Sequence, residues 1–219
     1  RDAGSGAENY SGGNIAIGYL SGTVFMSTSD NNVFVGQQAG RYATGSNNTF
    51  IGEQAGLGGT TSAPYSSGGN NTAVGYQALT AFTTAANNVA IGYGAGDSVT
   101  TGYQLTMVGY RAGSALTTQT NNTFIGFDAG IGNTGSSNVA IGNQSLNASA
   151  GGSNNIAIGG ASLFKITGDY NTAIGILAME THTTGERNIA IGHEAMDDTD
   201  SGSDSLGSED NIFIGYRAG

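Results

Sequence analysis

The stretch Asn188-Ile189-Ala190-Ile191-Gly192 decides the fold, because the chain repeats it with small changes along nearly its whole length. Each copy ends on a glycine, and successive glycines are 16 to 23 residues apart. So short and regular a period is typical of solenoids, in which each repeat buries its apolar face only against its neighbours. The glycines that close the twelve copies are Gly18, Gly36, Gly52, Gly75, Gly92, Gly109, Gly126, Gly142, Gly159, Gly175, Gly192 and Gly215.

The residues before the glycine alternate as a strand requires. The residue just before it is always Ile or Val, and the residue two positions earlier is Ile, Val or Thr. Side chains two apart on a strand point to the same side, and β-branched residues favour strands over helices. We therefore predict one short strand per repeat whose Ile/Val face points into the coil. Thr residues in this register, such as Thr49 and Thr72, are expected to point inward as well.

The residue between these two positions is also apolar. It is Ala in most copies, as at Ala73 and Ala190, and Phe or Met in the others, as at Phe50 and Met107. A strand with apolar residues on both faces is typically buried on both faces. One face can close the coil, and the other needs a second surface. The simplest supplier is another copy of the chain, so we predict a homo-oligomer.

Asn stands before the strand in eleven of the twelve copies, and Leu105 is the exception. Asn tolerates left-handed turns, and stacked Asn side chains can pair as a ladder, although a sugar-binding or ice-binding surface is an alternative role for them. After the glycine, a small residue such as Ala78 or Ala195 predicts a second short strand facing a narrow interior. Two strands and two turns account for a repeat of about this length.

The pattern Asn-x-Ala/Phe-Ile/Val-Gly-x-x-Ala/Ser-Leu/Gly resembles the head repeats of trimeric autotransporter adhesins. It is similar also to the Asn-Thr-Ala-Ile-Gly-Tyr-Gln-Ala-Leu repeats of phage tail-fibre-like proteins, which the stretch from Asn71 to Leu79 matches almost completely. The resemblance runs from Asn14 to Gly219 and implies a parallel β-roll, left-handed in the adhesin heads, with three chains side by side. Phe often stands here where those heads have Ala, and we expect a wider coil or a different packing between chains.

Composition restricts the partners. Lys and Arg number 6 against 16 Asp and Glu, which gives a net charge of −10 and disfavours nucleic acid and anionic membranes. No apolar run is long enough to span a membrane. The absence of Cys fits an extracellular solenoid without disulfides. The chain starts with Arg1 and shows no signal peptide, so we expect a processed product or an excised segment.

We divide the chain into a polar, Gly-rich lead segment at 1–13 and a single β-solenoid domain at 14–219. The two longest spacings place loop insertions near 56–70 and 197–210. The second insertion is acidic, and Asp198, Asp200 and Asp204 alternate with small polar residues around a glycine. Oxygen ligands at such spacing can hold Ca²⁺, whereas the alternative is a solvated acidic loop.

Aromatic residues follow the glycine in several copies, and Tyr76, Tyr93 and Tyr110 do so in three consecutive ones. Stacked coils would align them as a column. Exposed aromatics can bind sugar rings, so this column is a candidate ligand surface, and edge packing between chains or coils is the alternative. His182 and His193 are the only histidines and have no companion Cys, so we assign them no metal or acid–base role.

We find no nucleophile–base pair, phosphate loop or catalytic carboxylate pair, and we expect no enzyme activity and no cofactor other than a possible Ca²⁺. The sequence favours a structural and adhesive fibre, extracellular and carried on a cell surface or a virion, that displays a multivalent receptor-binding surface. The expected partners are other copies of the chain and a cell-surface glycan or protein receptor. An end-to-end polymerising filament is the alternative, and an ice-binding solenoid ranks below it because its Thr residues are expected to point inward.

Overall fold

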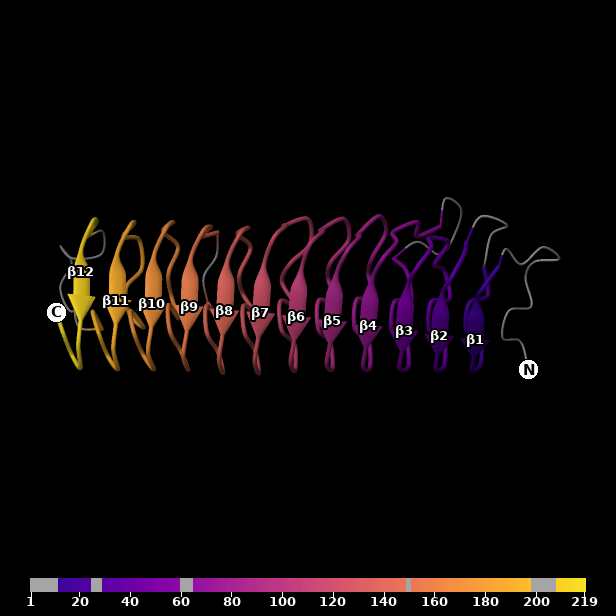
Figure 1. Ribbon diagram of the computed structural model, residues 1–219, viewed down its shortest axis with the longest axis horizontal. Helices are drawn as coiled ribbons and strands as arrows, with labels where there is room; N and C mark the ends of the chain where they lie inside the picture. Colours follow the sequence, from indigo (N-terminus) through magenta and orange to yellow (C-terminus); the bar gives the residue numbers. More distant parts are fainter. Residues whose placement is uncertain (1–11, 25–28, 60–64, 149–150, 198–207) are drawn as a thin grey trace. The chain divides into compact units, whose positions relative to one another are not determined.

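The computed structural model describes residues 12–24, 29–59, 65–148, 151–197 and 208–219. Over these residues the protein is an all-β, parallel β-solenoid without a helix, as the repeat predicted (Figure 1). The chain divides into two compact units, Arg1–Thr120 and Asn121–Gly219. Each unit is described by itself below, and the expectation of one continuous domain stays a prediction.

The first unit contains six strands of three residues each, and each strand pairs in parallel with the next one along the chain. The pairing is in register, so that Ala73 lies beside Ala90 and Val74 beside Ile91. The strands are β1 (Ile15–Ile17), β2 (Val33–Val35), β3 (Thr49–Ile51), β4 (Thr72–Val74), β5 (Val89–Ile91) and β6 (Thr106–Val108).

The second unit is built in the same way. Its six strands pair in parallel in sequence order, again in register, as with Ala173 beside Ala190. The strands are β7 (Thr123–Ile125), β8 (Val139–Ile141), β9 (Ile156–Ile158), β10 (Thr172–Ile174), β11 (Ile189–Ile191) and β12 (Ile212–Ile214).

The Asn residues before the strands form a buried ladder in each unit, as predicted. Asn155 shows its geometry: its Oδ1 accepts the backbone N–H of Asn171 in the next coil at 2.8 Å, and its Nδ2 donates to the carbonyl of Gly168 at 2.9 Å. One side chain therefore joins two coils and also fastens its own return segment. Leu105 interrupts the side-chain ladder, but its N–H still donates to the Oδ1 of Asn88 at 2.9 Å.

The repeating glycine is required by close contact between coils. Gly92 has φ +134°, and a Cβ placed on it would lie 2.3 Å from the carbonyl oxygen of Gly109 in the next coil. No side chain fits there, and the backbone angle is itself one that glycine alone adopts readily. The glycine column therefore sets how closely successive coils stack.

The middle residue of each strand points into the core, together with a residue four positions after the glycine. Phe50 is fully buried and faces Gly56, where an added Cβ would lie 2.3 Å from the ring. Ala73 is also fully buried, and in its coil the matching position is the buried Leu79. In several coils one core space is thus filled either by Phe from the strand or by Leu or Met from the turn, whereas Gly96, in the coil of Ala90, makes room for Met107 of the next strand. Glycine makes room for the ring of each strand Phe. The expectation of a wider coil or of a different packing between chains stays a prediction.

The predicted direction of the Ile/Val face is wrong. The middle residues Phe34, Ala73 and Ala140 are completely buried, whereas Ile91 on the other face is 39% exposed. The narrow interior accepts Ala, or Phe opposite Gly, but it has no room for two β-branched columns. Ile, Val and Thr therefore point outward, and the Thr residues of these columns do so as well.

The predicted second strand does not form in the coils that the structure describes. After the glycine the chain turns, and two residues with left-handed angles occur in quick succession, as at Gln77 (φ 54°) and Leu79 (φ 53°). The small residue between them, Ala78, does face the interior as expected, and it is fully buried. Two left-handed residues around one small residue make a tight corner, which leaves no length for a strand.

Both ends of the first insertion remain hydrogen-bonded to neighbouring coils. The backbone N–H of Gly59 donates to the carbonyl of Phe82 at 2.7 Å, and Ser66 pairs with Ala43 as a parallel bridge. Residues 60–64 lie outside the described part of the chain. Residues 1–11 of the lead segment and 198–207 of the second insertion do so too.

Candidate functional site: an exposed apolar sheet face

The outward face of the strands is apolar and carries no charged residue. The residue before each glycine is Ile or Val, and the one two positions earlier is Ile, Val or Thr. Because the strands pair in register, each of these positions forms a continuous column within its unit. We call the two columns together the Ile/Val face.

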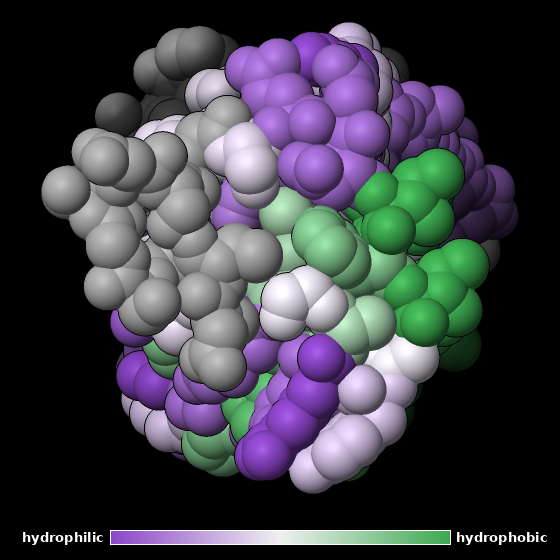
Figure 2. All heavy atoms as spheres, turned by 90° about the vertical axis from the view of Figure 1, so that its left-hand side faces the viewer, coloured by the Kyte–Doolittle hydropathy of each residue, from purple (hydrophilic) through white to green (hydrophobic). Residues whose placement is uncertain are grey.

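Exposure along the Ile/Val face is substantial in both units. In the second unit Ile156 and Ile158 are 39% and 36% exposed, and Ile212 and Ile214 of β12 both reach 67%. Figure 2, which looks onto the end with β12, shows hydrophobic atoms gathered on one side between more hydrophilic surfaces. Within each unit these partly exposed Ile and Val side chains lie side by side on paired strands, and a contiguous exposed apolar patch of this kind can mark an interaction site.

The predicted tyrosine column borders this face in the first unit. Tyr76 and Tyr93 stack with ring centroids 5.2 Å apart and planes 22° apart, and Tyr93 and Tyr110 stack at the same separation with planes 16° apart. The three side chains are between 38% and 50% exposed. Register pairing of β4, β5 and β6 aligns them, because each follows its glycine directly.

Stacking decides which part of these rings a ligand can reach. Both faces of Tyr93 are covered by its neighbours, and the Arg111 guanidinium lies 5.2 Å from the centroid of Tyr110. A sugar needs an uncovered ring face to stack on an aromatic side chain. A ligand at Tyr93 would therefore meet the ring edge and the hydroxyl group. The assignment of Tyr76, Tyr93 and Tyr110 as a ligand surface stays a prediction.

The predicted calcium ligands, Asp198, Asp200 and Asp204, lie outside the described residues. Among the residues that the structure describes, no cluster of three or more His, Cys, Asp or Glu side chains could hold a metal ion. The calcium prediction therefore rests on the sequence alone.

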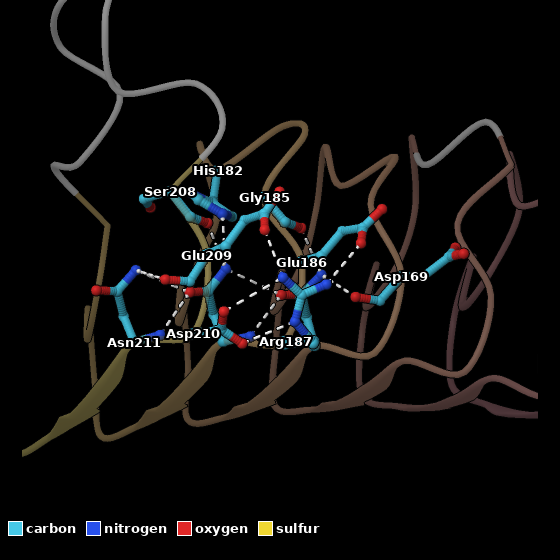
Figure 3. Close-up of polar contacts among 11 residues, drawn as sticks. Asp169, His182, Gly185, Glu186, Arg187, Ser208, Glu209, Asp210 and Asn211 are labelled. Atoms are coloured by element: carbon cyan, nitrogen blue, oxygen red, sulfur yellow. Dashed lines mark hydrogen bonds and ion pairs between the residues drawn. The ribbon is translucent and has the colours of Figure 1, made fainter.

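A cluster of charged residues joins the last two coils of the second unit (Figure 3). The Arg187 guanidinium contacts the carboxylates of Glu186 at 2.9 Å and Asp210 at 2.7 Å, and it also pairs with Glu209. Arg187 and Asp210 occupy the left-handed position before the Asn ladder, which is Asn or Gln in many other coils. This cluster does not follow from the repeat, and the signal for it is the replacement of Asn by charged residues at that position.

The charged cluster changes the acidity of its members. The hydrogen bond from Arg187, with its positive charge, lowers the pKa of Asp210, and the hydrogen bonds to Asp210 and Glu209 raise the pKa of Arg187. Arg217 likewise lowers the pKa of Glu194, with which it forms an ion pair. Both carboxylates therefore stay charged to lower pH and help to join the coil of β12 to that of β11.

The two histidines lie in contrasting places. His193 is exposed and stacks on Tyr216 with ring centroids 5.6 Å apart. His182 is fully buried, and its Nε2 lies 3.3 Å from the Nδ2 of Asn188 in the ladder. Beyond the place of His182 in the repeat, no residue pattern indicates this burial.

No family model matches the chain, and no curated protein matches it. Across the described residues, no helix is long and apolar enough to cross a membrane.

Proposed function

We propose that this chain is part of a non-enzymatic extracellular fibre, of the tail-fibre or surface-adhesin kind, in which three copies pack through their Ile/Val faces. The observation that carries the proposal is the exposure of this face in both units, with Ile91 at 39% and Ile158 at 36%. Burial of apolar surface is the main favourable term in most protein association. A contiguous exposed apolar surface is typical of an interaction site.

A further copy of the chain is the partner that fits this face best. The face is uncharged, and its side chains recur at every strand, so an identical copy presents matching columns at the same spacing. Most soluble oligomers are built from identical chains with closed symmetry. The number of three copies and the left-handed coil follow from the resemblance to adhesin heads and tail fibres.

The adhesive role rests on the same resemblance and on the tyrosine column. Three copies of a weak site on one fibre gain avidity through effective concentration, without any single deep pocket. Ring edges and hydroxyl groups of Tyr76, Tyr93 and Tyr110 are half exposed and offer hydrogen bonds to a glycan or protein receptor. Cell-surface or virion location is part of this proposal.

An ice-binding solenoid gains one supporting observation, because the Thr residues on the strands point outward rather than inward. Thr49 and Thr72 are neighbours on the outward face, and both are partly exposed. Thr occupies only one of the two columns, however, and alternates there with Ile and Val. Self-association therefore ranks first, and an end-to-end filament remains the alternative assembly.

Native mass in solution, measured by light scattering, tests the proposal. We expect the wild type to have the mass of three chains, and Ile91→Asp and Ile158→Asp to shift it to one chain. Thr101→Asp is the matched control, because Thr101 is exposed in the return segment away from the Ile/Val face. A monomeric wild type would overturn the proposal and favour ice binding. Large polydisperse species would indicate the filament, and their loss with a chelator would indicate Ca²⁺.

A further inference from the structure

The Ile/Val face by itself does not fix how far one copy is displaced along another. In the second unit every strand presents Ile in the column before the glycine and Ile, Val or Thr in the other column. A copy displaced by one coil would therefore meet nearly the same surface. In coiled coils, whose apolar seams also repeat, flanking charges help to specify the pairing. The residues beside the Ile/Val face are thus the place to search for a register signal.

Two borders of exposed residues run along the Ile/Val face, one on each side. The leading border is the residue five positions before each glycine, and the trailing border is the pair of residues directly after it. On the leading border, Asn154, Tyr170 and Arg187 are exposed and have left-handed backbone angles. On the trailing border, Ile176 and His193 are exposed as well. Strand pairing in register aligns each border into a column along the second unit.

The charges on the two borders alternate in sign at β11 and β12. At β11 the leading border carries Arg187 and the trailing border Glu194, and at β12 the leading border carries Asp210 and the trailing border Arg217. Inside the chain, Arg187 pairs with Asp210 at 2.7 Å (Figure 3), and Arg217 pairs with Glu194. Three of the four side chains are 43% to 67% exposed, and Glu194 is 18% exposed. Unlike charges therefore neighbour each other along each border and occupy opposite borders of the same coil.

The coil of β10 carries a matched apolar pair. Tyr170 on the leading border is 59% exposed, and Ile176 on the trailing border is 55% exposed. Large apolar side chains with so much surface in water gain free energy when a partner buries them. Each of the last three coils thus carries, on one border, a side chain that suits the opposite border of the same coil.

Contacts between copies at equal level join these matched side chains. A copy that runs in the same direction sets the leading border of one chain against the trailing border of the next, for any symmetry axis parallel to the solenoid. Arg187 then meets Glu194 of the next copy. Asp210 meets Arg217, and the carboxylate of Glu209, which stands beside Asp210, adds to this attraction.

A displacement by one coil in either direction brings like charges together. In one direction Asp210 and Glu209 face Glu194, and in the other direction Arg187 faces Arg217. Like charges that face each other across an interface disfavour that arrangement. A displacement repeated at every contact also prevents closure of a ring and gives an open filament. The borders therefore bear on the choice between a closed oligomer and a filament.

We propose that the two borders contact each other between copies at equal level, so that charge complementarity at β11 and β12 fixes the register of the assembly. The inference rests on the proposed function, since it requires copies that associate through the Ile/Val face. A copy that runs in the opposite direction along the whole second unit would place each border against itself and would gain none of these contacts. The contacts between two copies are Tyr170 with Ile176, Arg187 with Glu194 and Asp210 with Arg217.

Exchanging the two charges of one border tests the register without removing the ion pairs inside a chain. Glu194→Arg/Arg217→Glu reverses the trailing border, and Arg187→Glu/Asp210→Arg reverses the leading border. Each exchange keeps an Arg beside a carboxylate within the chain, so circular dichroism should show that every variant is folded. The measured quantity is the dissociation constant of the oligomer, obtained by sedimentation over a series of concentrations.

Each exchange alone should raise the dissociation constant by at least about tenfold at low ionic strength, or give open, polydisperse species, because two attractive contacts at each interface become repulsive. The variant with both borders exchanged should return to within about threefold of the wild type. The difference should shrink at high salt.

The matched control is Asn143→Arg/Gly160→Glu, which places two opposite charges on the trailing border at β8 and β9. The leading border there carries the uncharged Ser137 and Asn154, and a Cβ on Gly160 would meet its nearest neighbouring atom at 3.8 Å. We expect this variant to have the dissociation constant of the wild type.

The outcomes separate this inference from the proposed function. Equal dissociation constants for the wild type and both single exchanges would overturn the register assignment and leave association through the Ile/Val face intact. Failure of the combined exchange to recover affinity would overturn it as well, because the loss would then not arise from mismatched borders. A wild type that stays monomeric at every concentration would overturn the proposed function and the register assignment together.

Discussion

The pairing of Phe50 with Gly56 in one core space gives the sharpest test of how this sequence specifies its fold. Phe50→Ala removes a fully buried ring that stacks on Phe34 at 5.0 Å and meets Phe82 edge-on at 5.4 Å. Such a truncation costs about 3–5 kcal/mol of unfolding free energy. Gly56→Leu alone should also destabilise, because its Cβ would lie 2.3 Å from the ring of Phe50.

The double variant Phe50→Ala/Gly56→Leu should recover most of this loss. It recreates the arrangement of Ala73 with Leu79, which are both fully buried, and Leu79 has the same left-handed angle (φ 53°) as Gly56 (φ 52°). A volume-conserving exchange usually costs less than about 1.5 kcal/mol, and the lost aromatic pairs add about 0.5–1.5 kcal/mol each. We expect a favourable coupling energy of at least about 2 kcal/mol between the two substitutions.

Denaturant unfolding followed by circular dichroism measures the four free energies of this cycle. The matched control is Phe50→Ala/Gly130→Leu, because Gly130 faces Phe124 in the other unit and cannot fill the space left at Phe50. No recovery is expected there. If the effects of Phe50→Ala and Gly56→Leu simply add, the two residues do not share a space and the argument from the core is refuted.

Two further predictions concern the ladder and the charged cluster. Asn155→Ala should lower the unfolding free energy by about 1–3 kcal/mol, because it removes the side chain that accepts the N–H of Asn171 and donates to the carbonyl of Gly168. The control is Asn154→Gly, because Asn154 is exposed and has a left-handed backbone angle. It should change the unfolding free energy by less than about 0.5 kcal/mol. Arg187 lowers the pKa of Asp210, so the contact between the two residues contributes to the unfolding free energy. This contribution is fully present above the unfolded-state pKa of about 3.9 and is lost as the pH falls through the lower folded-state pKa. Arg187→Gln should therefore reduce the fall of the denaturant unfolding midpoint as the pH is lowered below about 4. The same fall in the wild type and the variant would contradict the role of Arg187 in lowering the pKa of Asp210.

The repeat alone predicted the parallel β-solenoid, the strand before each glycine, the Asn ladder and the aligned tyrosines, whereas the second strand that it predicted does not form in the described coils. These features depend on spacing, and in-register stacking converts equal spacing into columns. The residues that break the repeat were harder to interpret. Leu105 lacks the ladder amide, yet the backbone bond to Asn88 persists because it needs only the N–H of Leu105.

Which strand face points inward could not be read from the sequence, because both faces are apolar. The period, the strand before each glycine and the Asn ladder follow from local alternation and from glycine and asparagine at fixed intervals, and these are visible in the residues alone. Packing in three dimensions places Phe50 and Ala73 in the core and turns Ile91 and Ile158 outward. The cause is steric: the coils stack closely at their glycine carbonyls and the narrow core takes few large side chains, such as Phe50 or Leu79, so two β-branched columns fit only outside.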